Sequence, residues 1–346
     1  MKKCCEVGSL SSKRDGSGPA SWGDKWHSDS ALYYPTHQSQ FNELGACIDQ
    51  FIIQGHTPDR PLLNAQSKIT ALGSCFAAEL RHFLSESGLS CDSFWVPSGL
   101  NNTFALHDFI HWCISGEESS RGYRYESCED GIKDWMPQEE LACYRGYIKN
   151  SDAFVFTTGL AEVWEDNQTG KVFWRGVPES VFKKNRHRLR LSTVEENVDQ
   201  LERLVTSIRS VNTNAPIILT LSPVPLKATF TKKSCITADC VSKSTLRLAL
   251  HYLLERGHAN VWYWPSFEIV KWLGAHLPYP VYGTDDQVTR HVSRHLVIEI
   301  MSSFIRSFYG ENFARELAQK YVTTLSLRTG GPGEPPKIYS GTIVRS

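Results

Sequence analysis

Five short apolar runs, separated by segments with helical spacing, constrain the fold of this 346-residue chain more than any other feature. Such runs are typical of strands that are buried on both faces of a sheet, while amphipathic segments between them predict covering helices. This alternation favours a mostly parallel sheet with right-handed crossovers. The sequence therefore predicts an α/β fold, a single three-layer α/β/α domain, with strands near residues 68–73, 89–96, 153–158, 216–222 and 259–264.

The first apolar run breaks at a glycine followed by a serine. Residues 69–72 are apolar, Gly73 and Ser74 end the run, and residues 76–84 repeat apolar side chains at helical spacing. Glycine suits such a strand-turn-helix corner because it accepts backbone angles that other residues avoid. The Ser74 hydroxyl is then free to project above the sheet edge, as a nucleophile would. The third run stops at Gly159 in the same way, which predicts that both strands end at a common edge.

Cys75 follows Ser74 directly and offers a competing nucleophile. Thiols are intrinsically better nucleophiles than alcohols, and a helix N-terminus favours the thiolate. A residue directly after the corner nevertheless points away from Ser74 or begins the buried face of the helix. We therefore interpret Cys75 as a small packing residue.

Charge and cysteine usage exclude several function classes. Lys+Arg and Asp+Glu are equal at 37 each, so no overall field attracts nucleic acid or an anionic membrane surface. The ten cysteines contain no Cys-x-x-Cys pair and there is no zinc-finger spacing, so we expect neither a metal nor a cofactor. No apolar run reaches membrane-spanning length, and the scattered thiols predict a cytoplasmic location.

The ends of the chain differ in composition from its centre. Residues 1–40 are rich in Ser, Gly, Lys and Asp, which predicts a disordered N-terminal tail. Such a tail can be an adaptor arm or a solvated terminus, and its composition favours the second. Residues 41–325 are predicted to form the folded domain, and residues 326–346 a flexible C-terminal tail.

Several sequence blocks, in a fixed order, resemble the signature of one family. Residues 73–77 spell Gly-Ser-Cys-Phe-Ala, the motif that names the GSCFA family, and further blocks lie at 158–164, 221–230, 242–247 and 285–293. The GSCFA family resembles the SGNH, or GDSL-like, hydrolases. The resemblance implies a flavodoxin-like sheet with strand order 2-1-3-4-5 and an ester-hydrolase site whose serine follows the first strand.

The resemblance also implies a catalytic triad. Ser74 would be the nucleophile, His291 its base, and Asp286 the acid that orients the base. The family pattern separates acid and base by three residues, whereas here they are five apart, so the chain between them must loop back or another acid must serve. Asp285 is the next candidate for the acid, and His295 for the base.

An oxyanion hole needs hydrogen-bond donors near the nucleophile. The resemblance suggests the Gly99 backbone and the Asn102 side chain, although both residue types are also common in ordinary loops. The position of the family's asparagine donor is occupied by Ala161, which has no side-chain donor. Asn101, Asn102 or a backbone amide must then replace it. Glu162 stands where the family has an aspartate, and it would contact substrate, brace the serine loop or be a surface charge beside a turn.

Later segments carry local signals of structure. Residues 166–174 predict a β-hairpin, and the basic run at 183–190 is interpreted as a solvated loop rather than a phosphate site. Two overlapping capping boxes within residues 192–196 predict the start of a helix. The next helix is expected to begin at Asp239 or Ser242.

Two basic residues of that next helix share one of its faces. Lys243 and Arg247 are one helical turn apart, so they would either steer an anionic group or face solvent.

Two functions fit these features. The first is a serine esterase or acyl-transfer enzyme that acts on a small acyl ester, such as an O-acetylated sugar, through an acyl-serine intermediate. The second is a non-catalytic binding or interaction protein that keeps the fold. We favour the enzyme, with a small-molecule or glycan ester as its partner. The acyl acceptor and the oligomeric state stay open.

Overall fold

The structure is a computed structural model, and it describes residues 32–92, 94, 96, 100–117, 122–123, 126–128, 131–133 and 138–317. Gly99, residues 1–31 of the predicted N-terminal tail and all of the predicted C-terminal tail lie outside this part. The side chain of Cys75 also lies outside it, so its predicted packing role stays a prediction.

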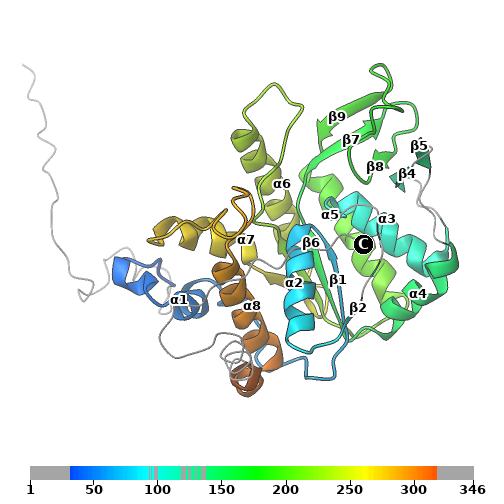
Figure 1. The fold of residues 1–346 in the computed structure, drawn as a ribbon. Helices are drawn as coiled ribbons and strands as arrows, with labels where there is room; N and C mark the ends of the chain where they lie inside the picture. The colour runs from blue at the N-terminus through cyan, green and yellow to red at the C-terminus, as the bar shows by residue number, and fades with distance from the viewer. Residues whose placement is uncertain are drawn as a thin grey trace, which may run out of the picture.

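A five-stranded sheet, parallel in every pairing between its named strands, forms the centre of the domain (Figure 1). Its strands are β1 (Ile69–Gly73), β2 (Cys91–Asp92), β6 (Ala153–Thr158), β10 (Ile217–Leu221) and β11 (Val261–Trp264). The spatial order β2-β1-β6-β10-β11 is the 2-1-3-4-5 order that the family resemblance implied, so that prediction is confirmed. Of the predicted second strand at 89–96, residues 91–92 pair with β1.

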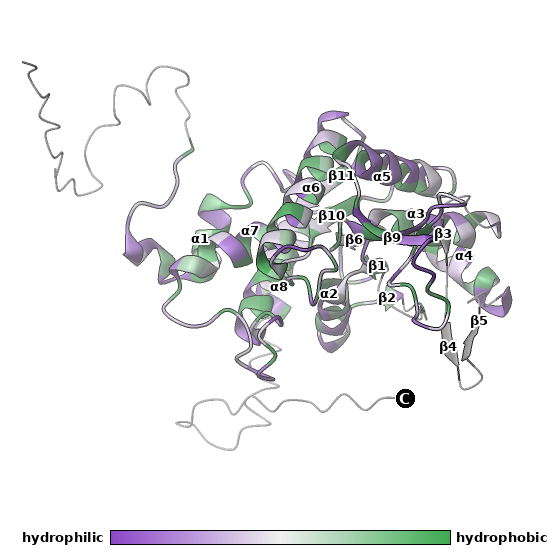
Figure 2. Ribbon diagram, turned by 90° about the horizontal axis from the view of Figure 1, so that it is seen from above, coloured by the Kyte–Doolittle hydropathy of each residue, from purple (hydrophilic) through white to green (hydrophobic). Residues whose placement is uncertain are grey.

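Helices cover both faces of the sheet (Figure 2). One layer consists of α3 (Thr103–Ser115), η2 (Gln138–Glu140) with α4 (Leu141–Asn150), α5 (Val194–Arg209) and α6 (Cys235–Glu255). The other consists of η1 (Gln38–Phe41), α1 (Leu44–Phe51), α2 (Cys75–Glu86), α7 (Ser266–Glu268), η3 (Ile269–Leu273), η4 (Gly274–His276) and α8 (Arg294–Tyr309). The predicted three-layer α/β/α architecture is confirmed. Within the described residues, no helix combines the length and apolar character needed to cross a bilayer.

The apolar runs of the central strands supply two separate cores. In β6, Phe154 and Phe156 pack against the layer of α3 to α6, whereas Ala153 and Val155 pack against the layer of α1, α2 and α8. Successive side chains of a strand point to opposite faces, so a strand covered on both sides needs apolar residues at every position. This is why each strand is a continuous apolar run in the sequence.

The protein contains a second sheet (Figure 1, upper right). Its order is β3 (Gly122–Tyr123), β8 (Val172–Phe173), β7 (Glu162–Asp166) and β9 (His187–Leu191), and β4 (Glu126–Cys128) pairs separately with β5 (Gly131–Lys133). Strands β7 and β8 are antiparallel, with Glu165 opposite Val172, around a turn that ends at Gly170. The predicted hairpin is confirmed.

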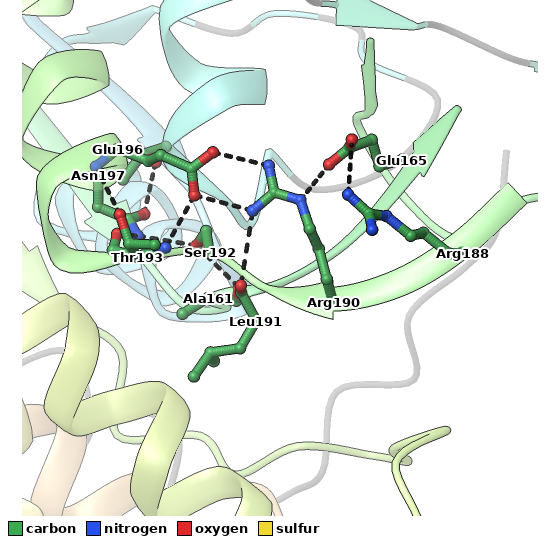
Figure 3. A network of polar contacts seen from close by, with 10 residues as sticks. Ala161, Glu165, Arg188, Arg190, Leu191, Ser192, Thr193, Glu196 and Asn197 are labelled. Carbon is green, nitrogen blue, oxygen red and sulfur yellow. Dashed lines mark hydrogen bonds and ion pairs between the residues drawn. The ribbon is translucent and has the colours of Figure 1, made fainter. Parts of the chain in front are cut away.

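The basic run at 183–190 is not the solvated loop that we predicted, because residues 187–190 pair with β7 as part of β9. Arg190 binds Glu165 of β7 and donates to Glu196 of α5 at 2.7 Å (Figure 3). Arg186 and Arg188 likewise pair with carboxylates of β7. The guanidinium groups are therefore neutralised within the fold, and the run holds the second sheet to α5.

The starts of α5 and α6 differ in how well local sequence predicts them. Thr193 and Glu196 form the predicted capping box of α5. Helix α6 begins at Cys235, before both predicted start sites. Asp239 instead accepts the Leu226 backbone N–H at 2.9 Å, within the helix rather than at its end. In sequence, Asp239 before an apolar run resembles a helix cap. Its hydrogen-bond partner, Leu226, lies on another segment and is not visible in the local pattern.

We expect Gly73→Ala to lower the free energy of unfolding by at least about 3 kcal/mol, because a Cβ there meets a backbone that must move. The backbone φ of Gly73 is 128°, and the added Cβ would lie 2.1 Å from the Thr157 carbonyl oxygen. The control is Gly170→Ala, where φ is also positive at 67° but the added Cβ would meet no atom of a neighbouring segment within 4 Å. The control should lose about 1 kcal/mol. Urea unfolding measures both, and equal losses would contradict the close approach of β1 and β6.

Candidate active site

Ser74 lies at the corner between β1 and α2, so the predicted strand-turn-helix unit is confirmed. Its backbone N–H donates to the Thr157 carbonyl at 3.0 Å, and its own carbonyl accepts the Ala77 N–H at 2.8 Å. Ser74 is 7% exposed, and its Oγ has no hydrogen-bond partner among the described residues. Most buried polar atoms are hydrogen-bonded, so an unpaired hydroxyl at this corner points to a functional role.

Two glycines let the ends of β1 and β6 meet beside this serine. Gly73 lies opposite Thr157 in the sheet. A Cβ on Gly159 would lie 3.2 Å from the Ser74 Cβ and 3.4 Å from the Asn101 carbonyl oxygen. The two strands therefore end at a common edge, as predicted, with Ser74 seated where they meet.

A cleft of 390 Å³ opens beyond the carboxyl ends of β1, β6 and β10. Ser74, Gly159 and Ser222 line it from these strand ends, while Glu162 and Trp164 line it from β7 of the second sheet. In open parallel sheets ligands bind at this edge. The second sheet thus adds one wall to a site whose position is set by the first.

The loop before α8 brings Asp286 and His291 together. His291 Nδ1 lies 2.5 Å from Asp286 Oδ2. The chain between them turns back through Gln287, whose φ is 62°, and the Val288 N–H donates to Asp286 Oδ1 at 2.9 Å. The five-residue spacing is therefore compatible with an acid–base pair. The hydrogen bond with His291 lowers the pKa of Asp286, and the Val288 N–H lowers it further.

The alternative acid and base have other surroundings. Asp285 accepts the backbone N–H of Arg294 at 2.7 Å, at the start of α8. The His295 ring packs edge-on against Tyr279, with ring centroids 4.6 Å apart. Asp285 thus binds the start of α8 and His295 packs on a tyrosine ring, whereas the Asp286 side chain binds the imidazole of His291.

The structure does not join this pair to the serine. The Oγ of Ser74 is unpaired among the described residues, and the side chains of His291 and Asp286 are 48% and 44% exposed. Arg290, next to His291, does line the serine's cleft and donates to the Pro225 carbonyl at 2.8 Å. The loop thus lies at the cleft, with its acid and base already paired.

Asn101 and Asn102 differ in what their side chains can still bind. Asn102 Oδ1 accepts the Ala105 N–H at 2.8 Å, and its Nδ2 donates to the Trp174 carbonyl at 3.2 Å. Asn101 lines the cleft, and its Oδ1 is buried without a partner among the described residues. Asn102 also lines the cleft, but its side chain caps α3 and anchors the second sheet, so Asn101 is the one of the two whose side chain such contacts do not hold in the described part of the chain. The other predicted donor, Gly99, lies outside the described residues.

The turn after β6 is held through its backbone, in place of the missing asparagine side chain. The Ala161 N–H donates to Ser242 Oγ, and the Ala161 carbonyl accepts from Ser192 Oγ, both at 2.8 Å. The N–H groups of Gly159 and Leu160 both donate to the Asn101 carbonyl at 2.8 Å. This turn therefore fixes the backbone of Asn101 at the cleft.

Lys243 lies beneath the same turn, not in solvent. It is 2% exposed, and its Nζ donates to the Gly159 carbonyl at 2.8 Å. Its expected neighbour Arg247 donates to Glu268 at 2.6 Å. Lys243 therefore fits neither of the two alternatives, anion steering or solvent exposure, and Arg247 is held by an ion pair. Sequence reasoning missed the role of Lys243, although its spacing from Leu246 and Leu250 places it on the apolar face of α6.

Glu162 lies on the wall of the cleft. Both of its carboxylate oxygens are 2.9 Å from the Thr229 hydroxyl, on the loop after β10. This position fits the predicted contact with substrate. No cluster of three or more His, Cys, Asp or Glu side chains suited to a metal ion occurs in the described part of the chain.

Comparison with known proteins gives a family and a set of distantly similar solved structures. The model that describes the GSCFA family matches residues 68–304. The salicylyl-acyltransferase SsfX3 of a tetracycline biosynthetic pathway is 12% identical with a TM-score of 0.34, over 71% of this chain and 54% of that one. This chain therefore spans about half the length of that protein.

The second structure is a carbohydrate esterase family 2 enzyme with a carbohydrate-binding domain, from Corynascus thermopiles (Myceliophthora fergusii). It is 14% identical with a TM-score of 0.31, over 77% of this chain and 69% of that one. Both similarities are too distant to assign an activity to this chain. No curated protein matches the sequence.

We expect Asn102→Ala to lower the free energy of unfolding by about 1 to 2 kcal/mol, because it removes a helix cap and a buried amide. Asn101→Ala should change that free energy by less than about 0.5 kcal/mol, because it removes a buried oxygen that has no partner among the described residues. Urea unfolding of both variants measures the difference. A larger loss for Asn101→Ala would show that Asn101 is the structural residue of the two.

Proposed function

The chain belongs to the GSCFA family, and we propose that it is a serine esterase or acyl-transfer enzyme that acts on a small acyl ester. The observation that carries the proposal is the unpaired, buried Oγ of Ser74 at the strand-end cleft. The resemblance of the family to SGNH hydrolases supports it. The six cysteines whose side chains are described carry free thiols, and we keep the cytoplasm as the proposed location.

In the proposed reaction, His291 takes the proton from Ser74 as Oγ attacks the ester carbonyl. Asp286 holds the imidazole by its Nδ1, which leaves Nε2 to face the serine. Collapse of the tetrahedral intermediate breaks the ester bond, and His291 returns the proton to the departing alcohol. Water or a second alcohol then attacks the acyl carbon while His291 takes its proton, the bond from that carbon to Ser74 Oγ breaks, and His291 returns the proton to Oγ. The half-exposed loop of His291 must approach Ser74 in the complex, since catalytic hydrogen bonds commonly tighten only when substrate binds.

The oxyanion needs donors that Ala161 cannot supply. The first backbone amides of a helix have no intrahelical partner, and Ser74 stands at that end of α2. The N–H groups of Ser74 and Ala77 are already bound, so we assign the amides of Cys75 and Phe76 and the Asn101 side chain as the donors. Asn101 is suited to this because its backbone is bound by the Gly159 turn while its side chain lines the cleft.

A non-catalytic binding protein is the second candidate. The observation that favours it is the absence of a hydrogen bond between Ser74 and His291 in the described structure, together with Ala161 at the donor position. Such a protein would keep the cleft and its ligand but form no acyl-serine. Loss of activity on removal of the serine hydroxyl separates the two.

We expect Ser74→Ala to reduce kcat for phenyl acetate hydrolysis by at least about 10³-fold, because the nucleophile is lost. The melting temperature should stay nearly unchanged, because the hydroxyl has no partner to lose among the described residues. Ser87→Ala is the control, since the Ser87 Oγ is also buried and unpaired in the described structure but lies at the other end of α2. Equal activity of wild type and Ser74→Ala would remove Ser74 from the mechanism.

We expect His291→Ala to lose as much activity as Ser74→Ala, and the double variant to be no worse than either. Groups that act as one nucleophilic unit are not additive. Asp286→Asn should lose less, through a misoriented imidazole, and Asp285→Asn should lose least because Asp285 contacts the helix start. Steady-state kinetics on phenyl acetate measures all five variants. A silent Asp286→Asn with an impaired Asp285→Asn would show that the acid was wrongly assigned.

A further inference from the structure

One wall of the cleft places an aromatic ring beside a carboxylate. Glu162 and Trp164 are two residues apart in β7, so they lie on the same face of the strand, and both line the cleft. Phe230, from the loop after β10, also lines it. The Phe230 ring packs edge-on against Trp164 with centroids 5.2 Å apart. This wall offers an apolar surface with an acceptor next to it.

The Glu162 carboxylate has unused capacity for hydrogen bonds. Its one hydrogen-bond partner in the described part of the chain is the Thr229 hydroxyl, which has a single proton to donate. An ionised carboxylate can accept about four hydrogen bonds. In the same part of the chain, Glu162 forms no ion pair with Lys, Arg or His. A ligand in the cleft must therefore bring donors to this side chain.

The charges along the cleft restrict the ligand further. Arg175, Lys227 and Arg290 line the same cleft as Glu162. A cationic ligand would be attracted by Glu162 and Trp164 but repelled by the three basic residues, whereas an anionic ligand at the wall of Glu162 would be repelled by its carboxylate. A neutral ligand with several hydroxyl groups meets no like charge. Its hydroxyls can donate to the carboxylate and accept from the basic side chains.

The geometry points to a neutral sugar as the alcohol part of the ester, with its hydroxyls on Glu162 and the apolar C–H face of its ring on Trp164. This inference rests on the proposed function, since it names the substrate class of the same site. Ser74 lines the same cleft, so an O-acyl group on that sugar can reach the nucleophile. Glu162 and Trp164 are then the residues that determine specificity.

The test compares four acetate esters that differ in their alcohol part. 6-O-acetylglucose is the neutral sugar ester, acetylcholine the cation, 4-acetoxybenzoate the anion, and phenyl acetate the ester without hydroxyls. We expect Glu162→Gln to lower kcat/KM for 6-O-acetylglucose by at least about tenfold relative to phenyl acetate, because a hydrogen bond to a charged group is lost. Trp164→Leu should shift the same ratio in the same direction.

Glu179→Gln is the matched control. Glu179 is an exposed carboxylate between β8 and β9 that does not line the cleft, and the variant changes the net charge equally. Its ratio of kcat/KM values should differ less than about twofold from wild type. An equal shift for Glu162→Gln and Glu179→Gln would overturn the inference, as would a wild-type preference for acetylcholine or 4-acetoxybenzoate.

A binding measurement distinguishes a failure of the sugar site from a failure of the proposed enzymatic function. Calorimetric titration of Ser74→Ala with 6-O-acetylglucose should show binding that the added Glu162→Gln change weakens by at least about tenfold. If no ester is hydrolysed but this binding is found, the enzyme is excluded and the sugar site stands. If phenyl acetate is hydrolysed but 6-O-acetylglucose is neither bound nor hydrolysed, the enzyme stands and the sugar site is overturned.

Discussion

The close approach of β1 and β6 at their carboxyl ends is the constraint on which the site depends. Gly73, with a φ of 128°, has no room for a Cβ beside Thr157, and Gly159 faces the Ser74 Cβ directly. Because no side chain separates the two strand ends, the hydroxyl of Ser74 lies at the sheet edge instead of over a neighbouring side chain. The start of α2, the base of the cleft and the position of Asn101 all follow from this contact.

Buried polar groups hold the turn that completes this edge. Ser242 and Ser192 bind the two sides of the Ala161 peptide, and Lys243 binds the carbonyl of Gly159. Burying an ammonium group is costly unless it is hydrogen-bonded, so Lys243 on the apolar face of α6 implies that the position of Gly159 matters. The turn has no side-chain donor of its own, and it acts on the site by fixing the Asn101 backbone.

The central sheet could be predicted because each strand is buried on both faces, which produces an apolar run that is visible locally. The strand β9 could not, because the partners of its arginines lie on β7 and α5, and a basic run without visible partners resembles a loop. Asp239 failed for the same reason, since its partner Leu226 lies on another segment. Long-range polar pairing leaves no periodic pattern in sequence.

The candidate site also combines residues that a local pattern predicts with residues whose roles depend on long-range contacts. Ser74 was found from the local break in an apolar run, and the pairing of Asp286 with His291 from the family resemblance despite the unusual spacing. Whether Asn101 or Asn102 caps α3 depends on the packing of α3 against the second sheet. That packing is a tertiary contact, and two adjacent asparagines cannot be told apart without it.

Every step of the proposed reaction requires that Ser74 be an activated nucleophile. Labelling of the native protein with a fluorophosphonate, followed by proteolysis and mass-spectrometric mapping, detects such a serine, because the reagent forms a stable adduct with a serine that a base has activated. We expect an adduct on Ser74 that is lost when the protein is denatured first, and none on the buried Ser87. A native protein that leaves Ser74 unmodified under conditions that label a known serine esterase would exclude Ser74 as an activated nucleophile.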